Sequence, residues 1–288
     1  MVNYTKTDWT HVLRRAASSG KRAILRNYDR KSRTTVVKRG VGGDLTLRID
    51  EVSERAIYSS LKRDLGEESF VFLSEELGEI GDPKKTTTPV IVCDPLDGSH
   101  NAQAGIPFFS LALSVIIPTS EKQNRAFGNV VHGIISSVMT KDEYYATKGK
   151  GAYHNNTRLV PRKIFPEQLQ TLLIETGDVD FLKEELLIKI TKRFVNKARM
   201  LGSAALSFCL LADGSADGMI FAQPGGARSI DSPAGYLIAR ESGCVFYDAS
   251  GRQSNIDQVQ VGFDSKINLI GAPNEKIGML LRRLVRLP

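Results

Sequence analysis

The chain has 288 residues, with 39 Lys or Arg against 32 Asp or Glu, and therefore a formal net charge of +7. Hydrophobic residues make up 41% and charged residues 25%, which excludes a chain that is disordered or fibrous as a whole. No apolar run approaches the roughly 18 residues of a membrane span, so we expect no membrane partner.

Two further features bear on the compartment. The first residues, MVNYTKTDWT, lack the apolar core of a signal peptide. The three cysteines are scattered and form no CxxC pair, which fits a reducing compartment and neither a disulfide framework nor a zinc site. We therefore expect a cytoplasmic protein whose length suits one large or two closely packed domains.

Positive charge gathers in residues 1–40, which hold eleven Lys or Arg and two Asp or Glu. Such a region is compatible with a nucleic-acid surface, with an exposed helix face followed by a basic loop, or with a positive rim around a site for anionic substrates. No aromatic residues alternate with the basic ones as a platform for single-stranded nucleic acid would require, which argues against a nucleic-acid partner.

The first half of the chain predicts two helices and then a series of strands. Apolar spacing indicates a helix over 8–28 and another over 50–65, which Gly66 ends. The polar, Gly-containing stretch 30–46 between them is typical of a mobile loop or a hairpin. Runs rich in β-branched and aromatic residues then predict strands at 70–74, 90–93, 108–117 and 129–138.

The second half alternates strands and helices. Strands are expected at 172–175, 218–221, 244–248 and 268–273. Helices are expected at 181–196, from about Ser203, from about Asp231, and after the last strand. We therefore predict stacked layers, with an antiparallel-leaning first half and an α/β second half. We also predict two lobes, residues 1–158 carrying most of the site and residues 159–288 completing it.

Acidic residues follow two of the predicted strands directly. Glu75-Glu76 comes after 70–74, Asp94 comes after 90–93, and Asp97 lies three residues further on, beyond Pro95. Ligands collect beyond the carboxyl ends of strands in open α/β layers, and crowded carboxylates repel one another unless a cation neutralises them. Oxygen ligands without His or Cys favour Mg²⁺.

A helix start at Gly98-Ser99 adds a second feature. Free N–H groups and the helix dipole at such a start favour a phosphate. A metal cluster beside a phosphate cradle describes a phosphomonoesterase site. The alternative is a capped turn, since Asp and Ser are common helix caps, but the acid Asp231 at another helix start disfavours it.

The stretch DPLDGSHNAQAGIPFFSLALSV resembles the signature of the inositol monophosphatase superfamily. Four more stretches agree in order and spacing, namely GDLTLRIDEVSE (43–54), LSEE (73–76), KGKGAYHN (148–155) and IDSPAGYLIARESG (230–243). The resemblance covers residues 8–286 and implies the α+β / α/β layered αβαβα sandwich of this family. It also implies a homodimer and inhibition by Li⁺.

The resemblance further implies a role for each matching residue. The Mg²⁺ ligands would be Glu75, Asp94, the Leu96 carbonyl, Asp97 and Asp231. Asp50 and the Ser99 hydroxyl would orient and deprotonate a water molecule, with Glu75 taking part in catalysis and no covalent phosphoenzyme. The N–H groups of Gly98 and Ser99 would hold phosphate oxygens. The substrate is also expected to contact Ser203 and Arg228.

Several of these residues have a second interpretation. Asp50 is also a candidate helix N-cap. Glu76 either supports a metal ligand or is a solvated acid. Lys38 and Arg39 either close over the phosphate or are exposed loop charge.

Departures from the family pattern bear on the substrate. Ile230 stands where the family usually has Trp, and Ala102 stands where it usually has Phe. Ser232-Pro233 replaces a common small or apolar pair. The acidic residue that often recognises inositol hydroxyls is absent, and Gln223 and Arg228 lie in that region instead. The form NAQAGIPFFS resembles the archaeal dual-specificity class, and an Arg suits a second phosphate.

The expected substrate is thus a small phosphorylated sugar or cyclitol, inositol monophosphate or fructose 1,6-bisphosphate. Two alternatives stay open. One is a 3′(2′),5′-bisphosphate nucleotidase, and the other is a non-catalytic nucleic-acid-binding or regulatory protein that uses residues 1–40.

Overall fold

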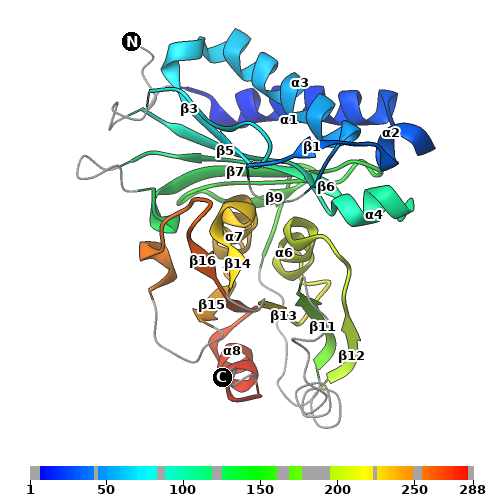
Figure 1. Ribbon diagram of the computed structural model, residues 1–288. Helices are drawn as coiled ribbons and strands as arrows, with labels where there is room; N and C mark the ends of the chain where they lie inside the picture. The colour runs from blue at the N-terminus through cyan, green and yellow to red at the C-terminus, as the bar shows by residue number, and fades with distance from the viewer. Residues whose placement is uncertain are drawn as a thin grey trace.

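Helices and sheets alternate in five layers in the computed structural model, which describes residues 7–41, 45–82, 88–118, 125–160, 169–176, 195–222, 226–248 and 255–284. The layers are, in order, helices α1 (Trp9–Arg26) and α3 (Arg48–Leu65), an eight-stranded sheet, helices α6 (Ala204–Ala212) and α7 (Pro233–Glu241), a five-stranded sheet, and helix α8 (Glu275–Leu284) (Figure 1). The predicted αβαβα sandwich is confirmed.

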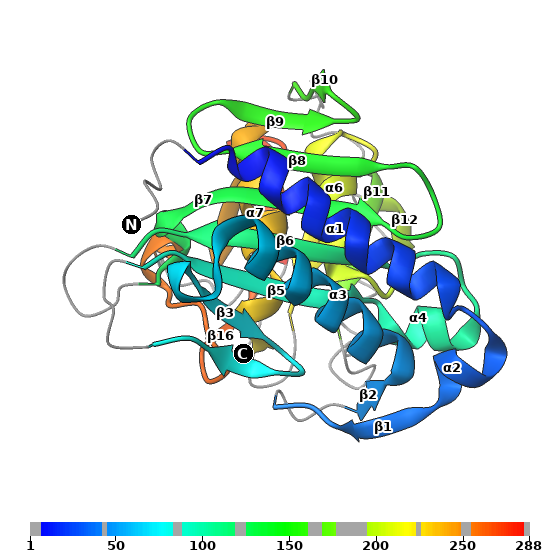
Figure 2. The same ribbon diagram turned by 90° about the horizontal axis from the view of Figure 1, so that it is seen from above.

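The eight-stranded sheet has the order β10-β9-β8-β7-β6-β5-β3-β4, and its neighbours are antiparallel except for the parallel pair β3 and β5. Seen from above, α1 and α3 lie across it (Figure 2). Its strands are β3 (Val71–Ser74), β4 (Gly78–Ile80), β5 (Val90–Asp97), β6 (Ser110–Ile116), β7 (Val130–Ser137), β8 (Glu143–Thr147), β9 (Gly151–His154) and β10 (Thr157–Arg158).

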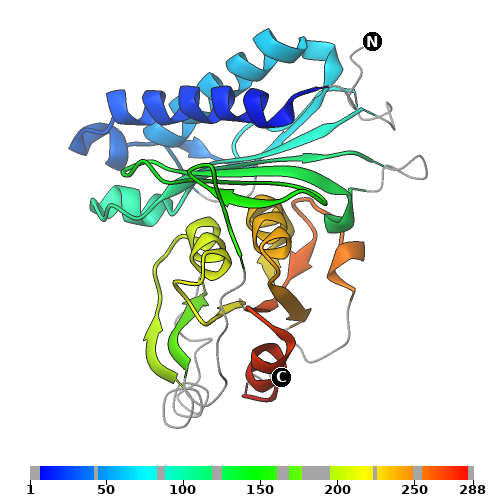
Figure 3. The same ribbon diagram turned by 180° about the vertical axis from the view of Figure 1, so that it is seen from behind.

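The five-stranded sheet has the order β12-β11-β13-β17-β15. Strands β12, β11 and β13 are parallel, whereas β17 and β15 join antiparallel. The view from behind places α8 on the outer face of this sheet, opposite the layer of α6 and α7 (Figure 3). Its strands are β11 (Leu169–Glu175), β12 (Val195–Arg199), β13 (Gly218–Phe221), β15 (Val245–Asp248) and β17 (Leu269–Ala272).

Short elements connect these layers. Two small antiparallel pairs join β1 (Val36–Arg39) to β2 (Leu45–Leu47), and β14 (Ala227–Arg228) to β16 (Lys266–Ile267). The short helices are α2 (Arg30–Thr34), α4 (Ser99–Ala104), η1 (Glu67–Ser69), η2 (Phe127–Asn129), η4 (Ser229–Asp231) and η5 (Ile256–Gln258).

Burial on both faces explains why β5 has no polar–apolar alternation in its first half. Val90 and Val92 belong to the apolar cluster that includes α6 and α7, whereas Ile91 and Cys93 belong to the cluster under α1 and α3. Side chains of a strand alternate between faces, so a strand covered on both faces has a continuous apolar run. Its polar end at Asp94 therefore stands out in the sequence.

Most predicted helix boundaries hold within two residues. The Asp8 carboxylate caps α1 by accepting a hydrogen bond from the His11 N–H at 3.0 Å, and Gly66, with φ of +84°, ends α3 as predicted. However, α3 begins at Arg48 instead of Asp50. The interpretation of Asp50 as the N-cap is therefore wrong, because this residue lies in the first turn, three positions beyond the capping residue Leu47.

Three other predictions need comment. Residues 30–46 contain the expected hairpin, β1 with β2, but also the helix α2. The helix expected at 181–196 falls mainly outside the described residues, and its last two residues belong instead to strand β12, paired in parallel with β11. The division into two lobes at residues 158 and 159 stays a prediction.

No helix within the described ranges is long and apolar enough to cross a membrane.

Candidate active site

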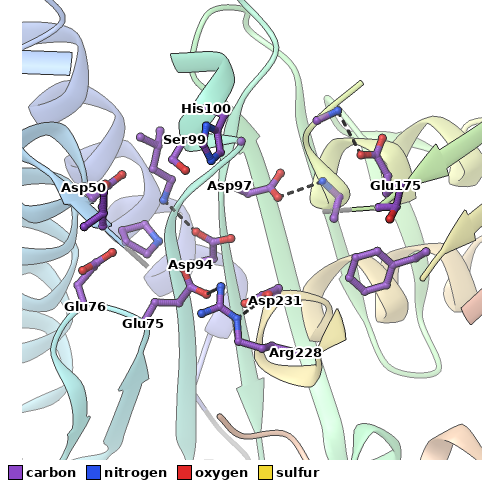
Figure 4. Close-up of a pocket in the computed structure, with 18 residues that line it drawn as sticks. Asp50, Glu75, Glu76, Asp94, Asp97, Ser99, His100, Glu175, Arg228 and Asp231 are labelled. Atoms are coloured by element: carbon purple, nitrogen blue, oxygen red, sulfur yellow. Dashed lines mark hydrogen bonds and ion pairs between the residues drawn. The ribbon is translucent and has the colours of Figure 1, made fainter. Parts of the chain in front are cut away.

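Seven acidic side chains line one cavity of about 370 Å³ at the end of β5, near the starts of α4 and α6 (Figure 4). They reach it from segments far apart in the sequence and include every carboxylate predicted for the site. The seven are Asp50, Glu75, Glu76, Asp94, Asp97, Glu175 and Asp231. Leu96, Gly98, Ser99 and Arg228 line the same cavity, so of the predicted site residues it lacks only Ser203.

An irregularity at the end of β5 brings two acids to one cavity. The register between β5 and β6 shifts between Asp94 and Asp97, where Pro95 cannot donate a ladder hydrogen bond. The Leu96 N–H donates to Asp94 Oδ1 at 3.0 Å, which fixes that carboxylate. Both side chains are therefore held in the cavity by the backbone of one strand.

Asp97 also caps the helix α6. Its carboxylate accepts hydrogen bonds from the N–H groups of Ala204 and Ala205, at 3.0 and 3.1 Å, and from the hydroxyls of Ser110, at 3.2 Å, and Ser203. Burial raises the pKa of Asp97, whereas these hydrogen bonds and the helix N-terminus favour its negative charge and oppose that rise. Ser203 is 1% exposed, and its hydroxyl donates to Asp97. A substrate contact for Ser203 stays a prediction.

The start of α4 requires glycine. Gly98 has φ of +88°, and a Cβ there would lie 3.0 Å from the Gly202 carbonyl oxygen. This close approach brings the start of α4 against the loop that leads into α6. The Asn101 side chain, on α4, links α4 to this loop by donating hydrogen bonds to the carbonyls of Phe108 and Leu201, at 2.8 and 2.6 Å. Gly98 and Ser99 are thereby fixed at the cavity wall.

The α3 side of the cavity is built from Asp50 and Glu76. Asp50 Oδ2 accepts a hydrogen bond from the Leu47 N–H at 2.6 Å. Glu76 is 7% exposed, and its carboxylate accepts a hydrogen bond from the Thr46 hydroxyl, so its interpretation as a solvated acid is wrong. Lys38 donates to the Glu76 carbonyl at 2.7 Å. This lysine therefore lies beside the acidic cavity.

Arg228 makes two ion pairs inside the cavity. Its Nη2 lies 2.5 Å from Glu75 Oε1, and its Nε lies 3.4 Å from Asp231 Oδ2. Figure 4 shows the guanidinium between these two carboxylates. Arg228 is thus close to the predicted metal ligands, where the sequence predicted a substrate contact.

Glu175 was missed in the sequence. It ends β11 and accepts hydrogen bonds from the Ser207 hydroxyl at 2.6 Å and from the N–H groups of Leu201 and Gly202, at 3.3 and 3.1 Å. Burial raises its pKa to about 7. The signal was available, since the acid directly follows the apolar run LLI just as Asp94 follows VIVC.

Glu175→Gln is expected to remove one pH-dependent part of the stability. Between the ordinary glutamate pKa of 4.5 and about 7, the folded state holds a proton on Glu175 that the unfolded state has lost. The free energy of unfolding therefore falls as the pH rises through this range, by at most about 1.4 kcal/mol per pH unit. Denaturant unfolding of both proteins across the range should give a flatter curve for the variant. Parallel curves would contradict a raised pKa at Glu175.

The electrostatics of the cavity suit a bound cation. Burial, reinforced by Glu75 and then Asp97, raises the pKa of Asp94 well above its ordinary range, and burial likewise raises that of Asp50. Burial also raises the pKa of Asp231 to about 6, despite the opposing charge of Arg228. Each shift reflects negative charge held out of water without enough positive charge nearby.

The donor atoms fit Mg²⁺. All the acidic donors are oxygens, and Oδ1 of both Asp50 and Asp231 is buried with no hydrogen-bond partner among the described residues. Within these same residues, no group of three or more Asp, Glu, His or Cys side chains already has the arrangement of a metal site. These carboxylates thus have the chemistry to bind Mg²⁺, while Arg228 forms ion pairs with two of them, Glu75 and Asp231.

Several basic residues of α1 lie away from this cavity. His11, Arg14, Arg15 and Arg22 line a separate groove along α1. Arg14 pairs with Glu143 at 2.6 Å, and Arg15 with Asp64 at 3.3 Å. These residues of α1 therefore do not line the acidic cavity, and a positive rim around the site stays a prediction. Gln223, and residues 43 and 44 of the 43–54 stretch, lie outside the described residues.

Comparisons with known proteins agree over nearly the whole chain. The profile of the Inositol monophosphatase family matches residues 5–286. A fructose-1,6-bisphosphatase/inositol-1-monophosphatase of Methanocaldococcus jannaschii is 28% identical over 269 residues, which are 93% of this chain and 96% of that protein. The protein of the same name from Thermococcus kodakarensis is 31% identical over 270 residues, 94% of each. A solved inositol monophosphatase–fructose 1,6-bisphosphatase has a TM-score of 0.76 at 27% identity, covering 98% of this chain and 100% of its own.

Proposed function

Because this chain belongs to the inositol monophosphatase family and is a phosphomonoesterase, we propose that it hydrolyses inositol monophosphate, fructose 1,6-bisphosphate or both with Mg²⁺. The family expected from the sequence motifs is confirmed. The observation that carries the proposal is the cavity itself, in which seven carboxylates lie beside Gly98 and Ser99 at the start of α4. Relatives that carry both enzyme names support the pair of substrates.

One set of cavity groups would hold the metal ion. Glu75, Asp94, the Leu96 carbonyl, Asp97 and Asp231 would hold Mg²⁺. When bound, Mg²⁺ neutralises the buried acids, polarises the phosphate and lowers the pKa of water in the site. The carboxylate of Asp97 is oriented by hydrogen bonds from the N–H groups of Ala204 and Ala205 at the start of α6. The carboxylate of Asp94 is oriented by the Leu96 N–H.

Asp50 and Ser99 would position the attacking water and take its proton. Asp50 Oδ2 is committed to the Leu47 N–H, so the buried Oδ1 is the atom that can accept a proton. Burial raises the pKa of Asp50, so its carboxylate is a stronger base than that of a free aspartate. The N–H groups of Gly98 and Ser99 would hold the phosphate in line with the water.

Arg228→Ala is expected to separate the two substrates. Fructose 1,6-bisphosphate should have a kcat/KM at least comparable to that of inositol 1-phosphate, because a guanidinium can bind its second phosphate. A charge-assisted bond of ~1.5–3 kcal/mol predicts a roughly tenfold or greater loss for the bisphosphate and a much smaller loss for the monophosphate. Steady-state kinetics at saturating Mg²⁺ measures both. Equal losses, or none, would remove Arg228 from substrate recognition.

One substrate panel tests the proposal. Phosphate release is measured with and without Mg²⁺ on inositol 1-phosphate, fructose 1,6-bisphosphate and a 3′,5′-bisphosphate nucleotide. Turnover of either of the first two, lost in chelator, supports the proposal. Turnover of the nucleotide alone would favour a bisphosphate nucleotidase, and no turnover would favour a non-catalytic role. The homodimer and the inhibition by Li⁺ are further proposals, which rest on the family resemblance.

A further inference from the structure

The guanidinium of Arg228 lies inside the acidic cavity, in contact with two of its carboxylates. It pairs with Glu75 and with Asp231, two of the residues that would hold Mg²⁺ (Figure 4). The three side chains are 18%, 16% and 20% exposed, so water screens these pairs only partly. Seven of the described cavity-lining residues are acids and one is an arginine.

The backbone at Arg228 is held by strand pairing and by the hydrogen bonds of the next residue. Strand β14 pairs antiparallel with β16, with Arg228 opposite Lys266. The next residue, Ser229, donates its N–H to the Ser265 carbonyl at 2.9 Å and its hydroxyl to the Gly262 carbonyl at 3.1 Å. Rotation of the Arg228 side chain about its own bonds can therefore break the ion pairs while these backbone contacts stay in place.

We propose that Arg228 is a built-in cation of the metal-free site, which competes with the divalent metal for Glu75 and Asp231 and must withdraw when the metal binds. The inference rests on the proposed function only in taking these two carboxylates as metal ligands. A guanidinium and a divalent ion need the same oxygens, and their like charges repel at contact distance.

This competition has two consequences. In the metal-free protein, Arg228 offsets part of the repulsion among the buried acids and so stabilises the fold. In exchange it weakens the affinity for the metal, because every binding event must first break two partly buried ion pairs. Removal of the guanidinium should therefore destabilise the metal-free protein and tighten metal binding together. A merely structural arginine would not couple these two effects.

The test is calorimetric titration of the full chain with MgCl₂ or MnCl₂, without substrate, after treatment with chelator. Arg228→Met keeps the length of the side chain and removes its charge. We expect the metal to bind the variant about tenfold to a hundredfold more tightly than wild type. We also expect the metal-free variant to have a lower melting temperature than metal-free wild type. At saturating metal, the difference in melting temperature between the two proteins should be smaller.

Arg125→Met is the matched control. Arg125 makes a two-pronged pair with Glu79, at 3.0 and 2.7 Å, with a side chain 13% exposed, and it does not line the acidic cavity. Its loss should lower the melting temperature without changing metal affinity. Arg228→Lys keeps the charge and should bind metal with an affinity between those of wild type and Arg228→Met. Its comparison with wild type alone still tests the inference if the Met variant fails to fold.

Three results would overturn the inference. These are equal or weaker metal binding by Arg228→Met, the same tightening in Arg125→Met, and equal affinities for the Lys and Met variants of Arg228. None of them depends on turnover. An inactive protein with tighter metal binding in the Met variant would sink the proposed function and keep the inference. An active protein with unchanged affinity would do the opposite.

Discussion

Asp94→Asn is expected to abolish phosphate release and to leave a folded protein that, without metal, is more stable than wild type. The loss of activity should be roughly 10³-fold or more, since even one preorganised donor in an active site is worth about 10²–10³-fold. The carboxylate accepts a hydrogen bond from the Leu96 N–H, which the amide oxygen of Asn can also accept. Removing the charge therefore relieves repulsion without breaking that contact.

The pH dependence of this effect has a defined sign. Burial and the neighbouring charges of Glu75 and Asp97 raise the pKa of Asp94 in the folded state. Ionisation of Asp94 therefore costs stability, and this cost grows as the pH rises above the ordinary pKa of an aspartate. The variant should gain over wild type as the pH rises, in thermal unfolding carried out in chelator. An active variant, or one less stable than wild type at neutral pH, would contradict the role given to Asp94.

The sequence predicted the acids at strand ends well because that rule is local. Glu75 and Asp94 each follow an apolar run, and the sheet places those ends together. The same rule applied to LLIE would have found Glu175. The layers were also predictable, because continuous apolar runs such as 90–93 indicate strands covered on both faces.

Partners distant in the sequence were not predictable. Asp97 was predicted as a metal ligand, but its hydrogen bonds to the start of α6 join positions more than a hundred residues apart. The hydrogen bond from the Ser203 hydroxyl to Asp97 likewise joins two distant segments, and a substrate contact for Ser203 stays a prediction. Arg228 gave no sign of its pairing with Glu75, which depends on how β14 packs beside the end of β3. Such pairings follow from tertiary packing, which local pattern does not encode.

Asp97→Ala is expected to abolish activity as well, but with the opposite effect on stability. Its carboxylate accepts hydrogen bonds from two backbone N–H groups of α6 and from two serine hydroxyls. Without it these donors lose their partner and the N-terminus of α6 loses a negative charge beside its N-cap residue Ser203, at a cost of roughly 2–4 kcal/mol. Denaturant unfolding of the metal-free protein and phosphate release with Mg²⁺ measure the two effects separately.

Asp213→Ala separates the capping role from the catalytic one. Asp213 lies at the other end of α6 and also accepts hydrogen bonds there, from the Tyr144 hydroxyl at 2.8 Å and the Ser215 N–H at 2.9 Å. Its loss should cost stability and leave phosphate release intact under conditions where the protein is folded. If Asp97→Ala proved as stable as wild type, α6 would not depend on this carboxylate. That result would contradict the predicted contrast between the two acids, in which Asp97 stabilises the metal-free fold and Asp94 destabilises it.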